Sequence, residues 1–103
     1  MLEGKTYSFS ESNSTLELFF MENNQVLFVD HETREGGFTR SKYDGTYKIE
    51  RKELSFHFTK RDVNECGERC GAGEISKEER GQFDSQTNSI SFRKKTFKIK
   101  ETN

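Results

Sequence analysis

The sequence predicts an all-β fold, namely a single small antiparallel up-and-down barrel of about seven or eight short strands. Three observations predict it. A hairpin pattern occurs twice, 36 residues apart: a glycine, an aromatic residue two positions later, and then an apolar-polar-apolar triplet. The chain has no proline and eight glycines, which suits strands joined by tight turns. Ten phenylalanines and three tyrosines can supply a core although only 29% of the residues are apolar.

The two copies of the hairpin pattern define the middle of the predicted fold. The first runs from Gly45-Thr46-Tyr47 to Leu54-Ser55-Phe56, and the second from Gly81-Gln82-Phe83 to Ile90-Ser91-Phe92. In each copy, polar residues separate the two halves at the point where the chain should turn. Two copies are too few for a solenoid, so we interpret them as similar corners of one barrel. A chain of 103 residues is sufficient for one domain, which we assign to residues 1–103.

The other strands follow from the alternation of apolar and polar residues. We expect strands over residues 4–10, 15–21, 25–30, 43–50, 54–60 and 96–100, with the second hairpin over 81–93. Residues 31–42 are polar with two glycines at their centre, and residues 61–73 carry three glycines and show no periodicity, so we expect exposed loops there. Residues 74–80 fit either a short strand or a helical turn. Closing the meander into a barrel would remove its edges.

Aromatic side chains on one face of these strands predict the core. The residues that we expect to line the core, or to contact a ligand inside it, are Phe20, Phe28, Tyr47, Phe56, Phe58, Phe83, Phe92 and Phe97. The interior of an eight-stranded barrel is just wide enough for side chains to fill, so we expect these rings to occupy it themselves. A ligand cavity remains the alternative, and an empty apolar space above about 300 Å³ would favour it.

Two of the predicted strands are also apolar on the face that should meet solvent. We expect a bulge, a neighbouring loop, a second subunit or another protein to cover this face. The candidate partner surface combines it with part of the first predicted loop. It consists of Phe19, Met21, Leu27, Val29, Gly36, Gly37 and Phe38.

Cys66 and Cys70 lie in the second predicted loop, four positions apart. They can close a disulfide in an oxidising compartment, which would make the protein extracytoplasmic. Free thiols and metal or redox chemistry are the alternatives. Redox pairs usually have two intervening residues, and one cysteine pair with distant partners such as His57 is a poor zinc signal. We therefore expect no metal and no cofactor. The sequence shows neither a secretory signal pattern nor an apolar run long enough to span a membrane, and it leaves the compartment open.

Several motifs resemble the small bacterial lipocalin-like barrel proteins. They are Leu2-x-Gly4 followed by Tyr7, Leu16-x-Leu18-x-Phe20 followed by Asn24-x-Val26, and Gly45-Thr46-Tyr47-Lys48-Ile49 before Leu54-x-Phe56. The similarity covers residues 2–60 and continues from Gly81 to Phe92. The chain departs from the group in having Tyr7 where a Gly-x-Trp is common, and it has no tryptophan. The resemblance implies a barrel that binds a small apolar molecule or inhibits another protein.

The charged residues give little support to catalysis or to nucleic-acid binding. Seventeen basic and 18 acidic residues nearly balance. Arg93, Lys94, Lys95, Lys98 and Lys100 lie close to Phe92 and Phe97, a combination that can hold single-stranded nucleic acid. These two rings fit the core-facing register, however, so we interpret the lysines as the solvated side of an edge strand. His31 and His57 belong to no nucleophile or metal motif, so we do not expect an enzyme.

We therefore predict a non-enzymatic module that binds another protein, or a second copy of itself, through its loops and its outer apolar face. A carrier of a small hydrophobic ligand inside the barrel is the alternative. Single-stranded nucleic-acid binding through the C-terminal basic strand is a lesser one.

Overall fold

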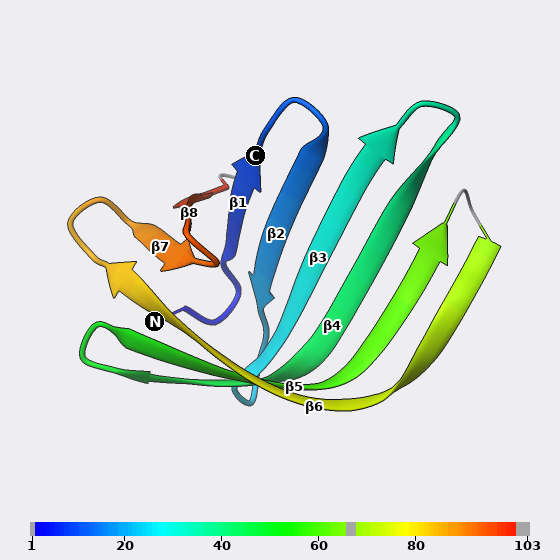
Figure 1. Ribbon diagram of the computed structural model, residues 1–103. Coiled ribbons are helices and arrows are strands. Elements are labelled where there is room, and N and C mark those ends of the chain that lie inside the picture. The colour runs from blue at the N-terminus through cyan, green and yellow to red at the C-terminus, as the bar shows by residue number, and fades with distance from the viewer. Residues whose placement is uncertain (1, 66–67, 101–103) are drawn as a thin grey trace.

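Eight antiparallel strands close into a barrel in the computed structural model, which describes residues 2–65 and 68–100 (Figure 1). The strands are β1 (Thr6–Ser10), β2 (Ser14–Phe20), β3 (Gln25–Arg34), β4 (Gly37–Glu50), β5 (Glu53–Glu65), β6 (Glu68–Asp84), β7 (Ser89–Phe92) and β8 (Lys95–Ile99). Each strand pairs with the next one along the chain, and β8 pairs with β1. The described residues include no helix. The predicted all-β, up-and-down barrel is therefore confirmed.

Three central strands are much longer than the sequence pattern predicts. β4, β5 and β6 have 14, 13 and 17 residues, whereas β7 and β8 have four and five. The register shifts between Asp44 and Gly45 in the β4–β5 pairing. It shifts again between Phe58 and Lys60 in the β5–β6 pairing. Such irregularities bend strands and increase their twist. The long strands accordingly curve strongly and extend into an open part of the sheet (Figure 1).

Residues 31–42 and 61–73 are hairpin strands, and the prediction of exposed loops there was wrong. β3 continues to Arg34, and β4 begins at Gly37 after a two-residue turn. Gly36 in that turn has a φ of 86°, a conformation that glycine adopts without steric cost. The second segment forms the paired ends of β5 and β6. Both segments carry polar residues on both faces, so they lack the alternation that marks a half-buried strand. Pairing with the neighbouring strands keeps them extended.

Both copies of the sequence repeat form hairpins, but in different registers. Tyr47 pairs with Phe56 in the first copy, whereas Phe83 pairs with Ile90 in the second. The second register is therefore shifted by two residues, and its turn is longer. Asp84 begins that turn, and its carboxylate accepts a hydrogen bond from the backbone N–H two residues later, at 2.9 Å. This bond lowers the pKa of Asp84. A side chain that bonds its own backbone in this way stabilises a turn.

A glycine begins each copy because another strand passes too close for a side chain. A Cβ at Gly45 would overlap the backbone carbonyl oxygen of His57. A Cβ at Gly81 would lie 2.7 Å from the carbonyl oxygen of Ser91. Gly45 also stands at the register shift of the β4–β5 pairing. Glycine at these positions therefore permits a close backbone approach.

Aromatic rings pack together inside the barrel. Seven of the eight predicted core aromatics are buried, and Phe83 packs against them half-buried. The ring centroid of Phe28 lies 5.2 Å from that of Phe92 and 6.2 Å from that of Phe58. Distances of this size are those of rings in direct contact. Tyr7 is also fully buried, and its hydroxyl donates a hydrogen bond to Oδ1 of Asn88 at 2.6 Å.

Candidate binding site at the open end of the barrel

Strands β3 to β6 present a concave surface next to the aromatic core. Phe28 is fully buried and marks the inner face of β3. Residues that pair across strands share a face. The row that begins at Phe28 therefore continues through Tyr43 and Arg61 to Gly73 on the same face. The next row consists of Asp30, Ser41, Val63 and Gly71. We call the concave surface formed by these two rows the trough.

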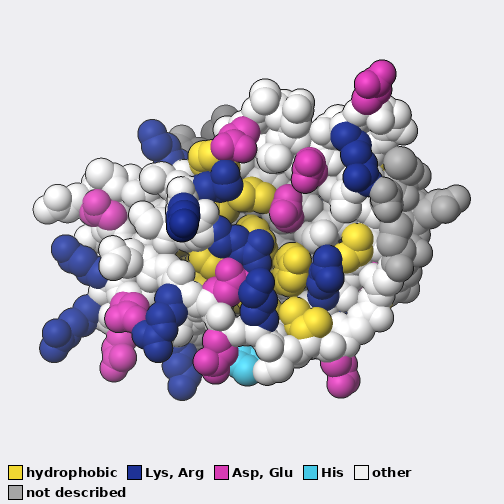
Figure 2. All heavy atoms as spheres, in the orientation of Figure 1, with side chains coloured by type: hydrophobic (Ala, Val, Ile, Leu, Met, Phe, Trp, Pro, Cys, Tyr) yellow, Lys and Arg dark blue, Asp and Glu magenta, His cyan; other side chains and the backbone are white. Residues whose placement is uncertain are grey.

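The trough combines apolar and charged groups and includes a hollow beside β6. Figure 2 shows hydrophobic side chains gathered in the middle of this view, with charged side chains among and around them. The surface is hollowed beside β6 because Gly71 and Gly73 carry no side chain. The hollow has a volume of about 400 Å³ and is lined by Arg61, Val63, Gly71, Ala72, Gly73, Glu74 and Ile75. None of the core aromatics lines it, so it is distinct from the barrel interior.

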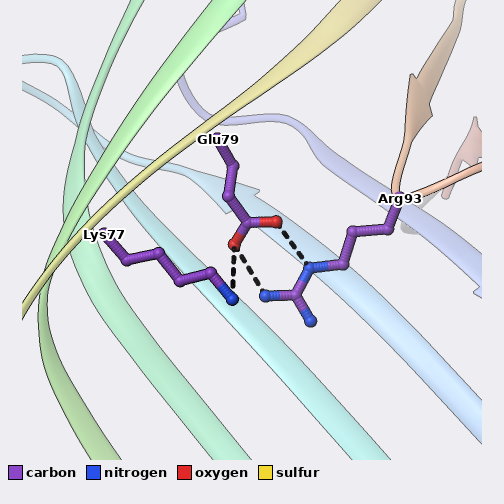
Figure 3. Close-up of polar contacts among 3 residues, drawn as sticks. All are labelled: Lys77, Glu79 and Arg93. Carbon is purple, nitrogen blue, oxygen red and sulfur yellow. Dashed lines mark hydrogen bonds and ion pairs between the residues drawn. The ribbon is translucent and has the colours of Figure 1, made fainter.

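Arg93 lies between the aromatic core and the trough. Its guanidinium carbon is 4.7 Å from the ring centroid of Phe28 and 5.5 Å from that of Tyr43. Its Nε and Nη2 donate hydrogen bonds to the two oxygens of Glu79 at 2.8 Å and 2.7 Å (Figure 3). Nζ of Lys77 lies 3.9 Å from the same carboxylate. A cation stacked on rings and held by a bidentate carboxylate thus covers one end of the apolar core.

The backbone at Arg93 adopts a costly conformation that aims this side chain. Phe92 and Lys95 pair with each other, and the two residues between them have φ angles of 52° and 62°. Positive φ at both central positions is typical of a type I′ turn, which favours Asn and Gly. A left-handed conformation costs an ordinary residue about 1–2 kcal/mol. The contacts of the Arg93 side chain offset this cost.

Burial and charge set the ionisation of the groups around the trough. Desolvation raises the pKa of Asp30, and the positive charge of Arg93 opposes that shift. Desolvation lowers the pKa of Arg93, but the hydrogen bonds and charge of Glu79 outweigh it, so this pKa lies above its usual value. Arg61 is exposed, and its guanidinium lies 5.8 Å from the Tyr43 ring centroid. It forms no ion pair with the described residues.

The Glu79–Arg93 pair should contribute measurably to stability, because its side chains are only 15% and 27% exposed. We expect a double-mutant cycle with Glu79→Gln and Arg93→Met to give a coupling energy of about 1–2 kcal/mol, as for a bidentate, partly buried pair. The matched control is Glu53–Arg80, whose side chains are 54% and 76% exposed. It should couple by less than about 0.5 kcal/mol. Urea unfolding of both cycles measures these energies, and equal values would contradict the prediction.

The residues predicted as a partner surface are mostly covered. Val29 is buried, and Phe19 and Leu27 are half-buried. Met21, at 38% exposed, is the one large hydrophobic side chain counted as exposed among the described residues. Phe38 is half-buried and stacks on His31, with ring centroids 5.3 Å apart. Gly36 and Gly37 lie in and directly after the β3–β4 turn. The structure therefore does not bring these residues together into one exposed apolar surface.

The C-terminal basic residues are divided among different surroundings. Arg93 points to Glu79, as described above. Nζ of Lys95 donates to Oε1 of Glu11 at 3.2 Å, and Nζ of Lys100 donates to Oε2 of Glu17 at 3.1 Å. Lys94 and Lys98 are exposed. β8 pairs with both β7 and β1, so the interpretation of this segment as an edge strand was wrong. Carboxylates balance much of the charge that was considered for nucleic-acid binding.

The two histidines make separate contacts. Nδ1 of His57 is 3.5 Å from Glu78 on the outer face, in a polar hollow of about 750 Å³ across β4 to β6. In the part of the chain that the structure describes, no three His, Cys, Asp or Glu residues are grouped to hold a metal.

The predicted bridge between Cys66 and Cys70 involves a residue outside the described ranges. Over residues 2–65 and 68–100 there is no helix with the length and apolar character needed to cross a membrane.

Comparisons with protein-family models, with curated proteins and with solved structures find no significant match to this chain.

The trough was not predicted from the sequence. Tyr43 began the predicted strand over residues 43–50, Arg61 began the predicted loop over residues 61–73, and Arg93 was grouped with solvated lysines. The signal that could have pointed to it is the two-residue spacing between Phe92 and Lys95, which fits a tight hairpin turn.

Proposed function

We propose that this protein is a non-enzymatic interaction module that binds another protein in the trough. One observation carries the proposal. The protein's own rings pack the barrel interior, while β3 to β6 extend beside it and present a concave surface with apolar and charged groups. The motifs that resemble lipocalin-like barrel proteins support the same reading, since that resemblance implies small-molecule binding or inhibition of another protein.

The chemistry of the trough favours a protein over a small apolar molecule. Small-molecule sites usually enclose most of their ligand. The trough is instead open, and its row of Phe28, Tyr43 and Arg61 continues outward to Gly73 at the margin of the sheet. Aromatic residues and arginine are the types that contribute most at protein interfaces. The polar hollow on the outer face is a weaker site because two of the side chains that line it, His57 and Glu78, already contact each other.

A carrier of a small hydrophobic ligand is the second candidate. The hollow beside Gly71 and Gly73 supports it, because its volume of about 400 Å³ exceeds the lower limit for small-molecule sites. The carrier would then hold its ligand at the trough rather than among the core rings.

A photo-crosslinking side chain placed in the trough tests the proposal. We expect benzoylphenylalanine at Val63 to form one discrete adduct with another protein in cells of the source organism. The same side chain at Lys60, on the opposite face of β5, should give at least five-fold less. Arg61→Glu should then weaken binding of the purified partner at least ten-fold, and Arg80→Glu on the outer face should leave it within two-fold. Absence of a Val63 adduct, or equal yields from both positions, would refute the proposal.

A further inference from the structure

We infer that the partner binds as an extended strand, added to the free edge of β6 over Gly71–Ser76, with one apolar or aromatic side chain seated in the hollow beside Gly71 and Gly73. The inference rests on the proposed function and specifies how the partner is held. Backbone pairing would supply affinity, and the hollow would supply specificity.

The edge of β6 is free over most of its length. On one side, β6 pairs with β5 from Gln82 back to Glu68. On its other side, β6 pairs with β7 through Gly81–Asp84 alone among the described residues. From Arg80 back to Glu68, β6 is therefore the margin of the sheet (Figure 1). A margin strand presents unpaired backbone N–H and C=O groups, which an incoming strand can pair with.

Side chains protect one part of this edge and leave another open. Lys77-Glu78-Glu79-Arg80 is a run of four charged residues, and Glu79 turns inward to Arg93. Charged and inward-pointing residues are typical protection against unwanted strand pairing. Gly71–Ser76 carries a single charge, and five of these six residues are exposed. Six residues of strand span about 20 Å, enough for one paired segment. The open window therefore has the length of an ordinary strand.

The hollow next to this window determines which side chain it accepts. A Cβ added at Gly71 or Gly73 would meet nothing within 4 Å, so the glycines leave space on the trough side. Val63 and Ile75 supply apolar walls. Arg61 also lines the hollow, and its guanidinium lies over the Tyr43 ring. It makes no ion pair with the described residues. An apolar residue fits such walls, and an aromatic residue can also stack on a guanidinium.

A second copy of this chain suits the edge less well than a different chain. Two copies of β6 related by a two-fold axis must pair antiparallel, with side chains of the same face opposite one another. The pairing that places Ile75 opposite Gly73 also places two copies of Glu74 directly opposite each other. Like charges in that position are destabilising. The pairing that places Ile75 opposite Gly71 places Gly73 opposite Gly73, so neither copy supplies a side chain at that position. We therefore assign the edge to a partner strand of different sequence.

The test uses a blocked host peptide, Thr-Lys-Thr-Val-Thr-X-Thr-Val-Thr-Lys-Thr, with Phe or Gly at X. We expect the Phe peptide to bind the whole protein at least ten-fold more tightly than the Gly peptide in NMR titrations. At saturation it should slow exchange at least ten-fold for those alternate amides of residues 71–76 whose N–H groups face the free edge. Gly73→Val fills the hollow and should weaken binding of the Phe peptide at least ten-fold. The control Lys60→Val places the same side chain on the exposed outer face of β5, away from the hollow, and should leave binding of the Phe peptide within two-fold.

The outcomes separate this inference from the proposed function. If no peptide binds up to 1 mM, or if Phe and Gly peptides bind equally, the inference is overturned. If the peptide shifts Tyr43 and Val63 resonances without slowing exchange in β6, the inference is overturned and the proposed function stands. If the free protein is a dimer with β6 amides already protected, a second copy occupies the edge and the inference fails. Absence of the Val63 crosslink refutes the proposed function independently of the peptides.

Discussion

Phe28→Ala is expected to lower the free energy of unfolding by about 3–5 kcal/mol, the usual cost of truncating a buried phenylalanine. Phe28 is fully buried, and its ring contacts Tyr43, Phe58, Phe92 and Phe97. The Arg93 guanidinium also lies over it, 4.7 Å from the ring centroid. Truncation would remove these contacts and leave a cavity that strands on all sides prevent from collapsing. Urea unfolding at equilibrium measures the loss.

Two further variants keep this prediction testable. A domain of this size has a total stability of about 5–15 kcal/mol, so Phe28→Ala can prevent folding altogether. Phe28→Leu retains most of the volume and should cost about 1–2 kcal/mol. Phe38→Ala is the control, since Phe38 is half-buried in the β3–β4 hairpin and packs on His31 outside the core cluster. It should cost less than about 1 kcal/mol. Equal losses for Phe28→Leu and Phe38→Ala would argue against a core centred on Phe28.

Gly45→Ala is expected to cost about 2–3 kcal/mol, because the added methyl group has no space. Its Cβ would overlap the carbonyl oxygen of His57 and lie 2.7 Å from Cα of Phe58. Both neighbours are backbone atoms of a paired strand, so they cannot move without breaking the β4–β5 pairing at its register shift. For a domain near 100 residues, this loss corresponds to a fall in Tm of about 8–24 °C. Calorimetry measures it directly.

Gly71→Ala is the matched control for Gly45→Ala. A Cβ at Gly71 meets nothing within 4 Å, and its φ lies outside the left-handed region. We expect a change of at most about 0.5 kcal/mol, of either sign, since alanine also restricts the unfolded chain. If the two substitutions had the same effect, close approach could not be the reason for the glycine at position 45.

The repeated hairpin pattern shows how far local sequence can specify this fold. The glycines and the aromatic residues correctly predicted two hairpins in one barrel. They did not predict the registers, because turn length determines register and the two turns differ. In the second copy, Asp84 and the polar residues after it form a longer turn than the first copy has. The aromatic residue two positions after the glycine therefore pairs with Phe56 in the first copy, where it is Tyr47, and with Ile90 in the second, where it is Phe83.

The candidate site was harder to predict because its residues come from separate parts of the chain. Tyr43 and Arg61 become neighbours only when β4 and β5 pair beyond their bulge. Arg93 reaches Phe28 from a turn 65 residues away, across the mouth of the barrel. Neither contact produces a repeating pattern in the sequence, because the alternation of apolar and polar residues indicates only which face of a single strand is apolar. This alternation carries no information on how strands distant in the chain approach one another.

The sequence by itself determined that this chain forms an all-β barrel with an aromatic core. Alternation with a period of two, turn residues and a few large rings are local properties, and hydrophobic burial follows from them. The tertiary structure alone decided that segments with polar residues on both faces become the ends of long strands. It also decided that Arg93 covers the core and that one edge of β6 is left free. These features arise from pairing, bulges and closure, which depend on all strands together.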